Sequence, residues 1–272
     1  MDWIMRLNNI VGFETGCTIM KIKMGNADIE CAWSYNQIRI ANASHIEVTA
    51  AIFRHILNLF KFSGKIQLEL CLDPRGVNNF PVLDGVTATA LRGGPIDTST
   101  VETFCSKYPT QKSAALLSKL SAELSPYSPI LILEDVYFCD TEGQSSKILE
   151  NFTGRILMID DAQLPETSII QFIRNWMTGS SHQNLEVLRI VFNLRCFINP
   201  GIVHEEFKNE AEVRDPSKRV MHYEFNTHII GRYRPYMFDC YDFLDIERHS
   251  DGRTASFLVM EYKFYFCVWK ND

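Results

Sequence analysis

The stretch that most constrains the fold runs from Asn151 to Asn193 and reads NFTGRILMIDDAQLPETSIIQFIRNWMTGSSHQNLEVLRIVFN. Two short apolar runs, at 155–164 and 185–192, flank a segment whose apolar residues recur at helical spacing and that ends near Trp176–Gly179. Short apolar runs bounded by turn residues are typical of strands, and the segment between them fits an amphipathic helix. The sequence therefore predicts a strand–helix–strand unit of a soluble α/β domain.

The same pattern begins upstream. The run ILILEDVYF (130–138) predicts a strand, and SSKILENF, which follows it, predicts a short crossover helix. Each unit resembles L-x-L followed by an apolar residue a few positions later, which is the signature of a leucine-rich-repeat turn. Because such units cannot bury their apolar faces alone, they must stack. The predicted fold is α/β, with degenerate leucine-rich-repeat-like β-α units stacked into a curved parallel sheet and helices on its outer side.

The N-terminal half is predicted to hold further elements of both kinds. Turn residues between β-rich runs indicate an antiparallel pair, and a capping box indicates the start of a helix. Strict apolar–polar alternation indicates a strand, and a helix-like composition indicates a second helix. The predicted elements are an antiparallel strand pair within 16–40, a helix within 44–64, strands at 65–73 and 86–94, and a helix at 110–124. The segment between the last two, 95–109, fits neither period.

The C-terminal stretch YDFLDIERHSDGRTASFLVMEYKFYFCVW predicts an antiparallel β-hairpin that closes the C-terminus. Asp251–Gly252 has hairpin-turn chemistry, and the flanking runs are rich in aromatic and β-branched residues. The last run carries large apolar residues on both faces, so that strand is expected to be covered on both sides. Trp176 ends the amphipathic helix and is expected in the core.

Composition argues against several classes of function. The formal net charge is −6 and no run of Lys or Arg occurs, so nucleic acid is not an expected partner. No apolar run approaches the length of about 18 residues that spans a bilayer, and no signal peptide is recognisable, so an intracellular location without membrane contact is expected. The eight cysteines include no CxxC pair, which favours thiols in a reducing compartment.

Candidate chemistry is sparse. His204-Glu205-Glu206 continues with Lys208 where a zinc site would need a second His, so neither a metal nor another cofactor is expected. The acidic pairs Glu134–Asp135 and Asp160–Asp161 fall at the ends of predicted strands, where carboxylates commonly solvate a turn. These observations favour a non-enzymatic protein. An enzyme of unrecognised class stays the alternative, and a pocket that gathers a Cys, a His and a carboxylate would indicate it.

Two stretches together carry a family resemblance. They are IIQFIRNWMTGSSHQNLEVLRI and, after a polar insert, the C-terminal stretch given above. The residues concerned are Trp176, Gly179, Leu185, Leu188, Ile190, Asp245, Ile246, Arg248, Asp251, Gly252, Ala255, Phe266, Val268 and Trp269. This combination resembles the F-box-associated domain (type 2) of the large nematode F-box protein family. The resemblance is strongest over 151–269.

The resemblance implies a single F-box-associated-like domain over residues 1–272. Such a domain resembles the substrate-recognition part of SCF-type ubiquitin ligases, so its implied partner is a protein to be ubiquitinated. The family's F-box binds the Skp1 adaptor, but no F-box is recognisable before the strand predicted from about residue 17. Binding of Skp1 by this chain is therefore not expected. A free-standing adaptor or decoy that recruits no ligase is the alternative.

A partner-binding surface can be predicted from the strand pattern. In a leucine-rich-repeat-like sheet, the side chains between the core leucines point to the concave face. Here these residues are Gln67, Glu69, Ile132, Glu134, Met158, Asp160 and Arg189. Three acidic residues against one basic residue favour a basic segment of an unknown protein partner. An ordinary solvated sheet face is the alternative.

Overall fold

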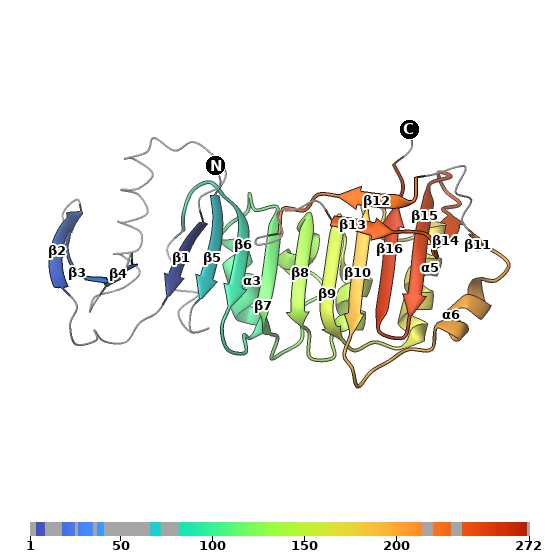
Figure 1. The fold of residues 1–272 in the computed structure, drawn as a ribbon, viewed down its shortest axis with the longest axis horizontal. Coiled ribbons are helices and arrows are strands. Elements are labelled where there is room, and N and C mark those ends of the chain that lie inside the picture. Colours follow the sequence, from blue (N-terminus) through green and yellow to red (C-terminus); the bar gives the residue numbers. More distant parts are fainter. Residues whose placement is uncertain are drawn as a thin grey trace.

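The computed structural model describes residues 82–213, 220–229 and 236–270 in full. Before residue 82 it describes the backbone of the strands at 4–8, 18–24, 27–34, 37–40 and 66–71. The largest element is an eleven-stranded sheet, which extends across both the N-terminal and the C-terminal half of the chain (Figure 1).

One side of this sheet is parallel. Its seven strands lie side by side in the order in which they occur in the chain. They are β1 (Ile4–Asn8), β5 (Ile66–Cys71), β6 (Val86–Arg92), β7 (Ser113–Lys119), β8 (Asp135–Asp140), β9 (Ile156–Ala162) and β10 (Val187–Phe192). The predicted α/β class, with a large and mostly parallel sheet, is confirmed. The leucine-rich-repeat form of its units stays a prediction.

The other side of the sheet is antiparallel. Beyond β10 follow β16 (Lys263–Val268), β15 (Thr254–Met260), β14 (Leu244–Glu247) and β11 (Glu212–Val213). The chain turns between β14 and β15 near Ser250–Arg253, and again at Glu261–Tyr262 between β15 and β16. Because β16 pairs directly with β10, the C-terminal part of the chain is joined to the parallel strands.

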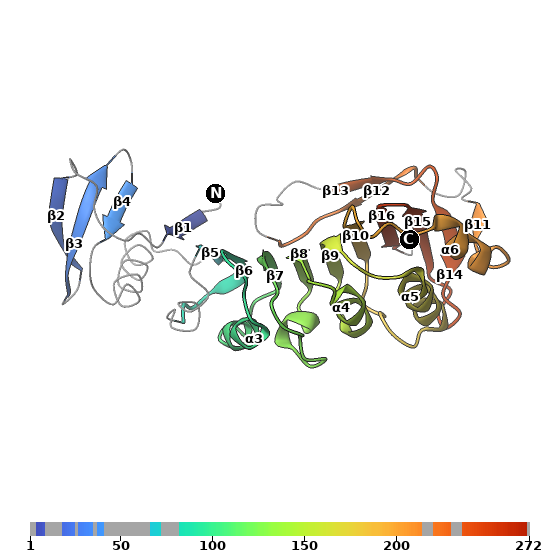
Figure 2. The same ribbon diagram turned by 90° about the horizontal axis from the view of Figure 1, so that it is seen from below.

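Helices cover one face of the sheet (Figure 2). They are α3 (Thr98–Ser106), the 3-10 helix η1 (Pro129–Ile132), α4 (Ser145–Asn151) and α5 (Glu166–Thr178). A further helix, α6 (Pro200–Phe207), packs against α5 and β15. The larger hydrophobic core lies beneath these helices. Trp176 of α5 is fully buried in it, as predicted.

Helix α3 lies in the segment that the sequence left unassigned, and its first turn explains why it forms. The side chain of Asp97 caps the helix, accepting hydrogen bonds from the Ser99 hydroxyl at 2.5 Å and from the Thr100 N–H at 2.8 Å. These hydrogen bonds, that from the Ser99 hydroxyl first, lower the pKa of Asp97 to about 2. Val101 and Phe104 are then directed into the core.

The opposite face of the sheet is covered by a segment that we call the strap, residues 220–229 and 236–243. Its strands β12 (His222–Phe225) and β13 (Tyr236–Asp239) pair with each other and lie across the sheet, opposite the helices (Figure 2). A second hydrophobic core fills this interface and includes Met158 of β9 and Phe238 of the strap. In the part of the chain described in full, the parallel strands therefore lie between two apolar layers, which agrees with their near-continuous apolar sequences.

Two sequence predictions about residues 110–138 are wrong. Residues 110–124 do not form a helix; Ser113–Lys119 is strand β7, almost entirely buried between β6 and β8. Burial on both faces replaces strand alternation with a run of Ala and Leu, which also suits a helix. The strand predicted at 130–138 begins instead at Asp135, because Pro129–Ile132 forms η1.

Other predictions agree with the structure. The antiparallel pair within 16–40 is present as β2 (Thr18–Met24) and β3 (Ala27–Ser34), and β4 (Gln37–Ile40) extends it. The strands expected at 65–73 and 86–94 are β5 and β6. Strand β16 is covered on both sides, since Phe266 packs in the first core and Cys267 in the second. The predicted helix within 44–64 lies outside the described residues.

Candidate functional site

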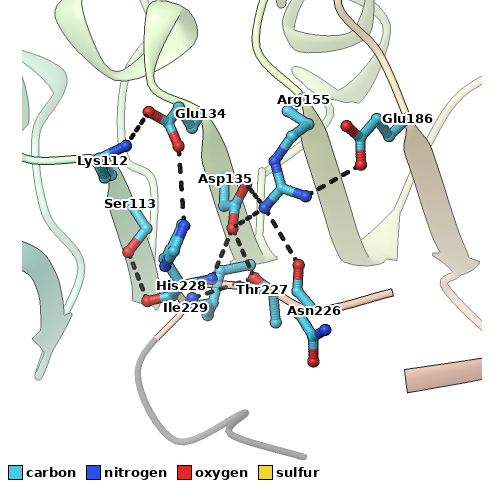
Figure 3. Close-up of polar contacts among 10 residues, drawn as sticks. All are labelled: Lys112, Ser113, Glu134, Asp135, Arg155, Glu186, Asn226, Thr227, His228 and Ile229. Carbon is cyan, nitrogen blue, oxygen red and sulfur yellow. Dashed lines mark hydrogen bonds and ion pairs between the residues drawn. The ribbon is translucent and has the colours of Figure 1, made fainter. Parts of the chain in front are cut away.

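A row of charged residues lies at the N-terminal edge of the parallel strands, where each strand begins. Charged side chains immediately precede or start β7, β8, β9 and β10 (Figure 3). We call these residues the edge cluster: Lys112, Glu134, Asp135, Arg155 and Glu186. Because parallel strands in register start at the same edge, side chains far apart in sequence come within hydrogen-bond distance there.

Asp135 is the centre of the edge cluster and is fully buried. Its carboxylate accepts from Nη2 of Arg155 at 2.8 and 2.9 Å, from the Thr227 hydroxyl at 3.1 Å and from the backbone N–H of His228 at 2.6 Å. Burial raises the pKa of Asp135, while these donors and the charge of Arg155 oppose that rise. The carboxylate thus ties the strap to the sheet.

Two further contacts hold the same part of the strap. The Ser113 hydroxyl donates to the carbonyl oxygen of His228 at 2.7 Å, so both backbone groups of His228 are fixed by the sheet. Glu134 lies beside them, 2.6 Å from Nζ of Lys112 and 3.8 Å from the His228 ring. The hydrogen bond from Lys112 lowers the pKa of Glu134. Most of the charges in this row therefore pair within the fold.

An open polar pocket of about 560 Å³ adjoins the edge cluster at Arg155. Three arginines contribute to its wall: Arg155 before β9, Arg248 after β14 and Arg253 before β15. Two acidic residues, Glu186 and Asp251, also line it. Glu186 accepts from Arg155 at 3.1 Å. This combination of three guanidinium groups and two carboxylates has the chemistry that a polar, charged ligand would need.

The remaining wall of the pocket is neutral and polar. It consists of Gln183 and Asn184 from the α5–β10 loop and Ser250 from the β14–β15 turn. The amide groups of Gln183 and Asn184 donate to backbone carbonyls of Gly179 and Thr153, which fixes their orientation. Each amide carries a second N–H that can serve a ligand.

Arg248 connects the pocket to the core. It is 2% exposed, donates from Nε and Nη2 to Asp251 at 2.9 Å in both cases, and lies over the ring of Trp176 with 5.0 Å to its centroid. A planar guanidinium suits both contacts at once. The β14–β15 turn is thereby fixed against the end of α5.

A glycine permits this close approach. Gly179 ends α5 with φ of +72°, and a Cβ there would lie 2.7 Å from Oγ of Ser250. Next to it, the backbone N–H of His249 donates to the carbonyl oxygen of Met177 at 2.8 Å. The helix end and the turn that carry the family resemblance are therefore one structural unit.

The α5–β10 loop is held from inside by His182. This residue is 5% exposed, its Nδ1 lies 3.1 Å from the carbonyl oxygen of Phe152, and its ring packs on Phe172. Burial lowers the pKa of His182 to about 4, so the ring is neutral at physiological pH. Its φ of +57° is a left-handed conformation, which is uncommon outside glycine.

The residues predicted from sequence as a partner surface do not form one open face. Ile132 lies in η1 and is 68% exposed, rather than on a strand. Glu134 belongs to the edge cluster, and Met158 is completely buried beneath the strap. Its expected place on an open face is wrong, because no sequence pattern indicates that the strap covers that side of the sheet. The side chains of Gln67 and Glu69 lie outside the described residues.

Asp160 and Arg189, the last two of that set, contact each other. Nη1 of Arg189 donates to Asp160 at 2.5 Å, and the Tyr137 hydroxyl donates to the same carboxylate at 2.8 Å. Much of the negative charge expected to attract a basic partner is thus offset within the chain. A basic partner segment stays a prediction.

The acidic pairs have their expected role only in part. Asp161 accepts from Asn193 in a loop contact at 2.5 Å, which agrees with a carboxylate at a strand end. Asp135 does not solvate a turn, because it begins a strand and is buried. The pairing of Asp135 with Arg155 was not predicted from the sequence. The available signal was that Asp135, Arg155 and Glu186 each stand directly before an apolar run.

Within the described ranges, no three His, Cys, Asp or Glu side chains gather as a metal site would require. In the same part of the chain, no helix is both long and apolar enough to cross a bilayer. Cys240 and Cys267 are buried in the second core, and burial raises the pKa of Cys267, so neither is placed as an accessible thiolate.

Comparison with known proteins gives one match. A family model described as F-box associated matches residues 144–190, which comprise α4, β9, α5 and the start of β10. The resemblance seen in the sequence is confirmed over this segment. No curated protein and no solved structure matches the chain.

Proposed function

We propose that this chain is a non-enzymatic protein-binding module, and that it acts as the substrate-recognition part of an SCF-type ubiquitin ligase. The observation that supports this most directly is the F-box-associated match over residues 144–190. The matched segment supplies strand β9 and the start of β10, in the middle of the eleven-stranded sheet, and the loop at 179–186 that lines the polar pocket. The part of the chain that resembles the family therefore also carries an accessible site.

The form of the site agrees with protein binding. Its side chains come from strand starts and from a turn locked against α5, so a partner would meet a surface that needs little reorganisation. An exposed rim of arginine, amide and hydroxyl groups suits the polar parts of a protein interface.

The experiment that tests this function is a saturable capture measurement. The immobilised full chain is exposed to lysate, captured proteins are identified, and each is produced pure for a binding isotherm. We expect at least one protein to bind saturably and to be displaced by excess chain in solution. If every captured protein binds without saturation, the chain is not a protein-binding module.

Ligase membership needs a separate measurement. Skp1 is tested for co-precipitation with the chain, with a characterised F-box protein as positive control and the chain's folding verified by circular dichroism. Co-precipitation of Skp1 supports direct membership of a ligase. Its failure beside a saturable partner would contradict direct recruitment and favour the adaptor or decoy function.

A further inference from the structure

We propose that the polar pocket binds an acidic side chain of the partner protein, a carboxylate or a phosphate, through Arg253 and Arg155. This inference rests on the proposed protein-binding function and adds the chemistry of what is recognised. The pocket has a volume of about 560 Å³, which is within the usual range for ligand sites and is larger than one side chain. It can therefore hold an acidic side chain together with part of its peptide backbone.

The three arginines of the pocket are not equally engaged. Arg248 is almost fully buried, with two guanidinium nitrogens directed at Asp251. Arg155 donates from Nη2 to buried Asp135 and from Nη1 to Glu186. Arg253 contacts Asp251 at 3.4 Å and its side chain is 47% exposed. Arg253 therefore presents the most accessible guanidinium, while Arg248 forms a fixed wall.

The charge that is open to a ligand favours an anion. Three arginines and two carboxylates line the pocket, and Asp135 beneath the lining balances Arg155 as a third carboxylate. Arg253 shares Asp251 with Arg248 and is half-exposed, so it carries the accessible positive charge. An incoming acidic group would replace the long contact between Arg253 and Asp251 with a direct charge-assisted pair. Guanidinium groups match the planar geometry of carboxylates and phosphates and can bind both in a bidentate manner.

Neutral groups complete the recognition surface. The second amide N–H groups of Gln183 and Asn184 and the hydroxyl of Ser250 can donate to an oxyanion or to peptide carbonyls. An apolar ligand is not expected to bind here, because the polar groups of the lining would lose their hydrogen bonds to water and gain no replacement. The pocket thus selects a polar, anionic segment of a peptide.

The site is also held rigidly. The cation–π contact of Arg248 with Trp176 and the bond from His249 to Met177 fix the β14–β15 turn on α5. Buried Asp135 fixes Arg155 from below. Because Arg155 and the wall around it are held in place, binding orders mainly the side chain of Arg253, and the loss of conformational entropy is small.

The test uses the full chain labelled with ¹⁵N and short peptides on one Gly/Ser scaffold. The peptides differ only at the centre, which holds Glu-Glu-Glu, a phosphoserine, Gln-Gln-Gln or Lys-Lys-Lys. Nε–Hε signals of arginine report binding at the guanidinium groups directly. We expect the Glu and phosphoserine peptides to shift the signals of Arg253 and Arg155, and the Gln and Lys peptides to leave them unchanged. The relative affinity of the first two peptides identifies the preferred anion.

Arg253→Gln is the decisive variant, and Arg195→Gln is its matched control. Both remove one positive charge from an exposed side chain, but Arg195 lies in the loop after β10, outside the pocket lining. Since a hydrogen bond to a charged group is partly screened at a half-exposed site, we expect R253Q to weaken binding of the Glu peptide about fivefold to tenfold. We expect R195Q to leave it unchanged.

The possible failures are distinguishable. If the Glu and Gln peptides bind equally, or if R253Q and R195Q have equal effects, the anion site is overturned. The protein-binding function still stands in that case if a protein partner binds saturably. Absence of any saturable protein partner overturns the function, and with it the assignment of the pocket to a partner segment, even where a peptide binds. Shifts confined to Arg253 and Arg155, with binding weakened in R253Q and unchanged in R195Q, support both proposals when a saturable partner is also found.

Discussion

Replacing Asp135 with Asn tests how the strap is held on the sheet. The variant keeps the shape of the side chain but loses its charge, and its NH2 group would face donors that the carboxylate now satisfies. These donors are the His228 N–H, the Thr227 hydroxyl and Nη2 of Arg155. The substitution therefore leaves buried groups badly paired, although it creates no cavity.

The magnitude follows from two opposing effects. Breaking a buried ion pair by removing one partner costs roughly 3–5 kcal/mol. The cost here is lower, because Arg155 keeps Glu186 as a partner and its side chain is 24% exposed. The raised pKa of Asp135 also shows that burial penalises its charged form, and the neutral amide escapes that penalty. We expect D135N to lower the free energy of unfolding by about 2 kcal/mol.

The assay is urea denaturation at pH 7, followed by tryptophan fluorescence and circular dichroism. Asp242→Asn, at an exposed position of the same strap, is the matched control and should change stability by less than about 0.5 kcal/mol. Hydrogen exchange at the His228 amide should accelerate in D135N and not in D242N. If D135N is as stable as the control, or if the His228 amide stays protected, Asp135 does not anchor the strap.

Three further substitutions test the surrounding structure. Gly179→Ala should lower the free energy of unfolding in urea by about 1–2 kcal/mol, because φ is positive there and the new Cβ would lie too close to Ser250. Gly94→Ala is the control and should change it little, because nothing lies within 4 Å of a Cβ at that position; equal effects of the two variants would contradict this explanation. Since the pKa of His182 is lowered, the stability that this neutral ring provides is complete above about pH 6.5 and is lost as the pH falls toward 4. The free energy of unfolding of the wild type should fall by about 3 kcal/mol over this pH range, and His182→Asn should abolish that fall. His249→Asn, at an exposed position, should keep it. A wild-type stability that does not change between these pH values would contradict the role given to His182. Asp97→Ala should lower the free energy of unfolding by about 1 kcal/mol at pH 7, because the helix cap is lost. The difference from the wild type should shrink as the pH falls from about 4 to 2, because the Asp97 carboxylate of the wild type is then protonated; a difference that does not depend on pH would show that its charge plays no part.

The sequence predicted those elements whose apolar pattern and composition fit one secondary structure. The amphipathic helix ending at Trp176 is present because its apolar residues recur at helical spacing, and the run at 155–164 is present as β9 because it is short and bounded by turn residues. Strands β7 and β9 are both buried on both faces, so neither alternates. Strand β7 was assigned incorrectly because its Ala–Leu composition also suits a helix. Tertiary burial, which a local pattern does not contain, decided its conformation.

The candidate site was less predictable than the fold. Arg248 and Asp251 could be singled out by family resemblance, but their contact with the end of α5 depends on the crossing of elements far apart in sequence. The importance of Asp135 depends on a strand start that lies five residues after that of the predicted strand. Met158 was expected on an open surface because the polar insert gave no sign that part of it returns as the strap. Long-range packing determined each of these outcomes.

Recognition of a protein through the polar pocket can be measured in one binding isotherm. A protein captured by the chain is purified and titrated into the wild type, R253Q and R195Q under identical salt conditions. We expect saturable binding that R253Q weakens about fivefold to tenfold and R195Q leaves unchanged. Identical isotherms for all three chains would contradict recognition through the pocket, and the absence of saturation would contradict protein binding itself.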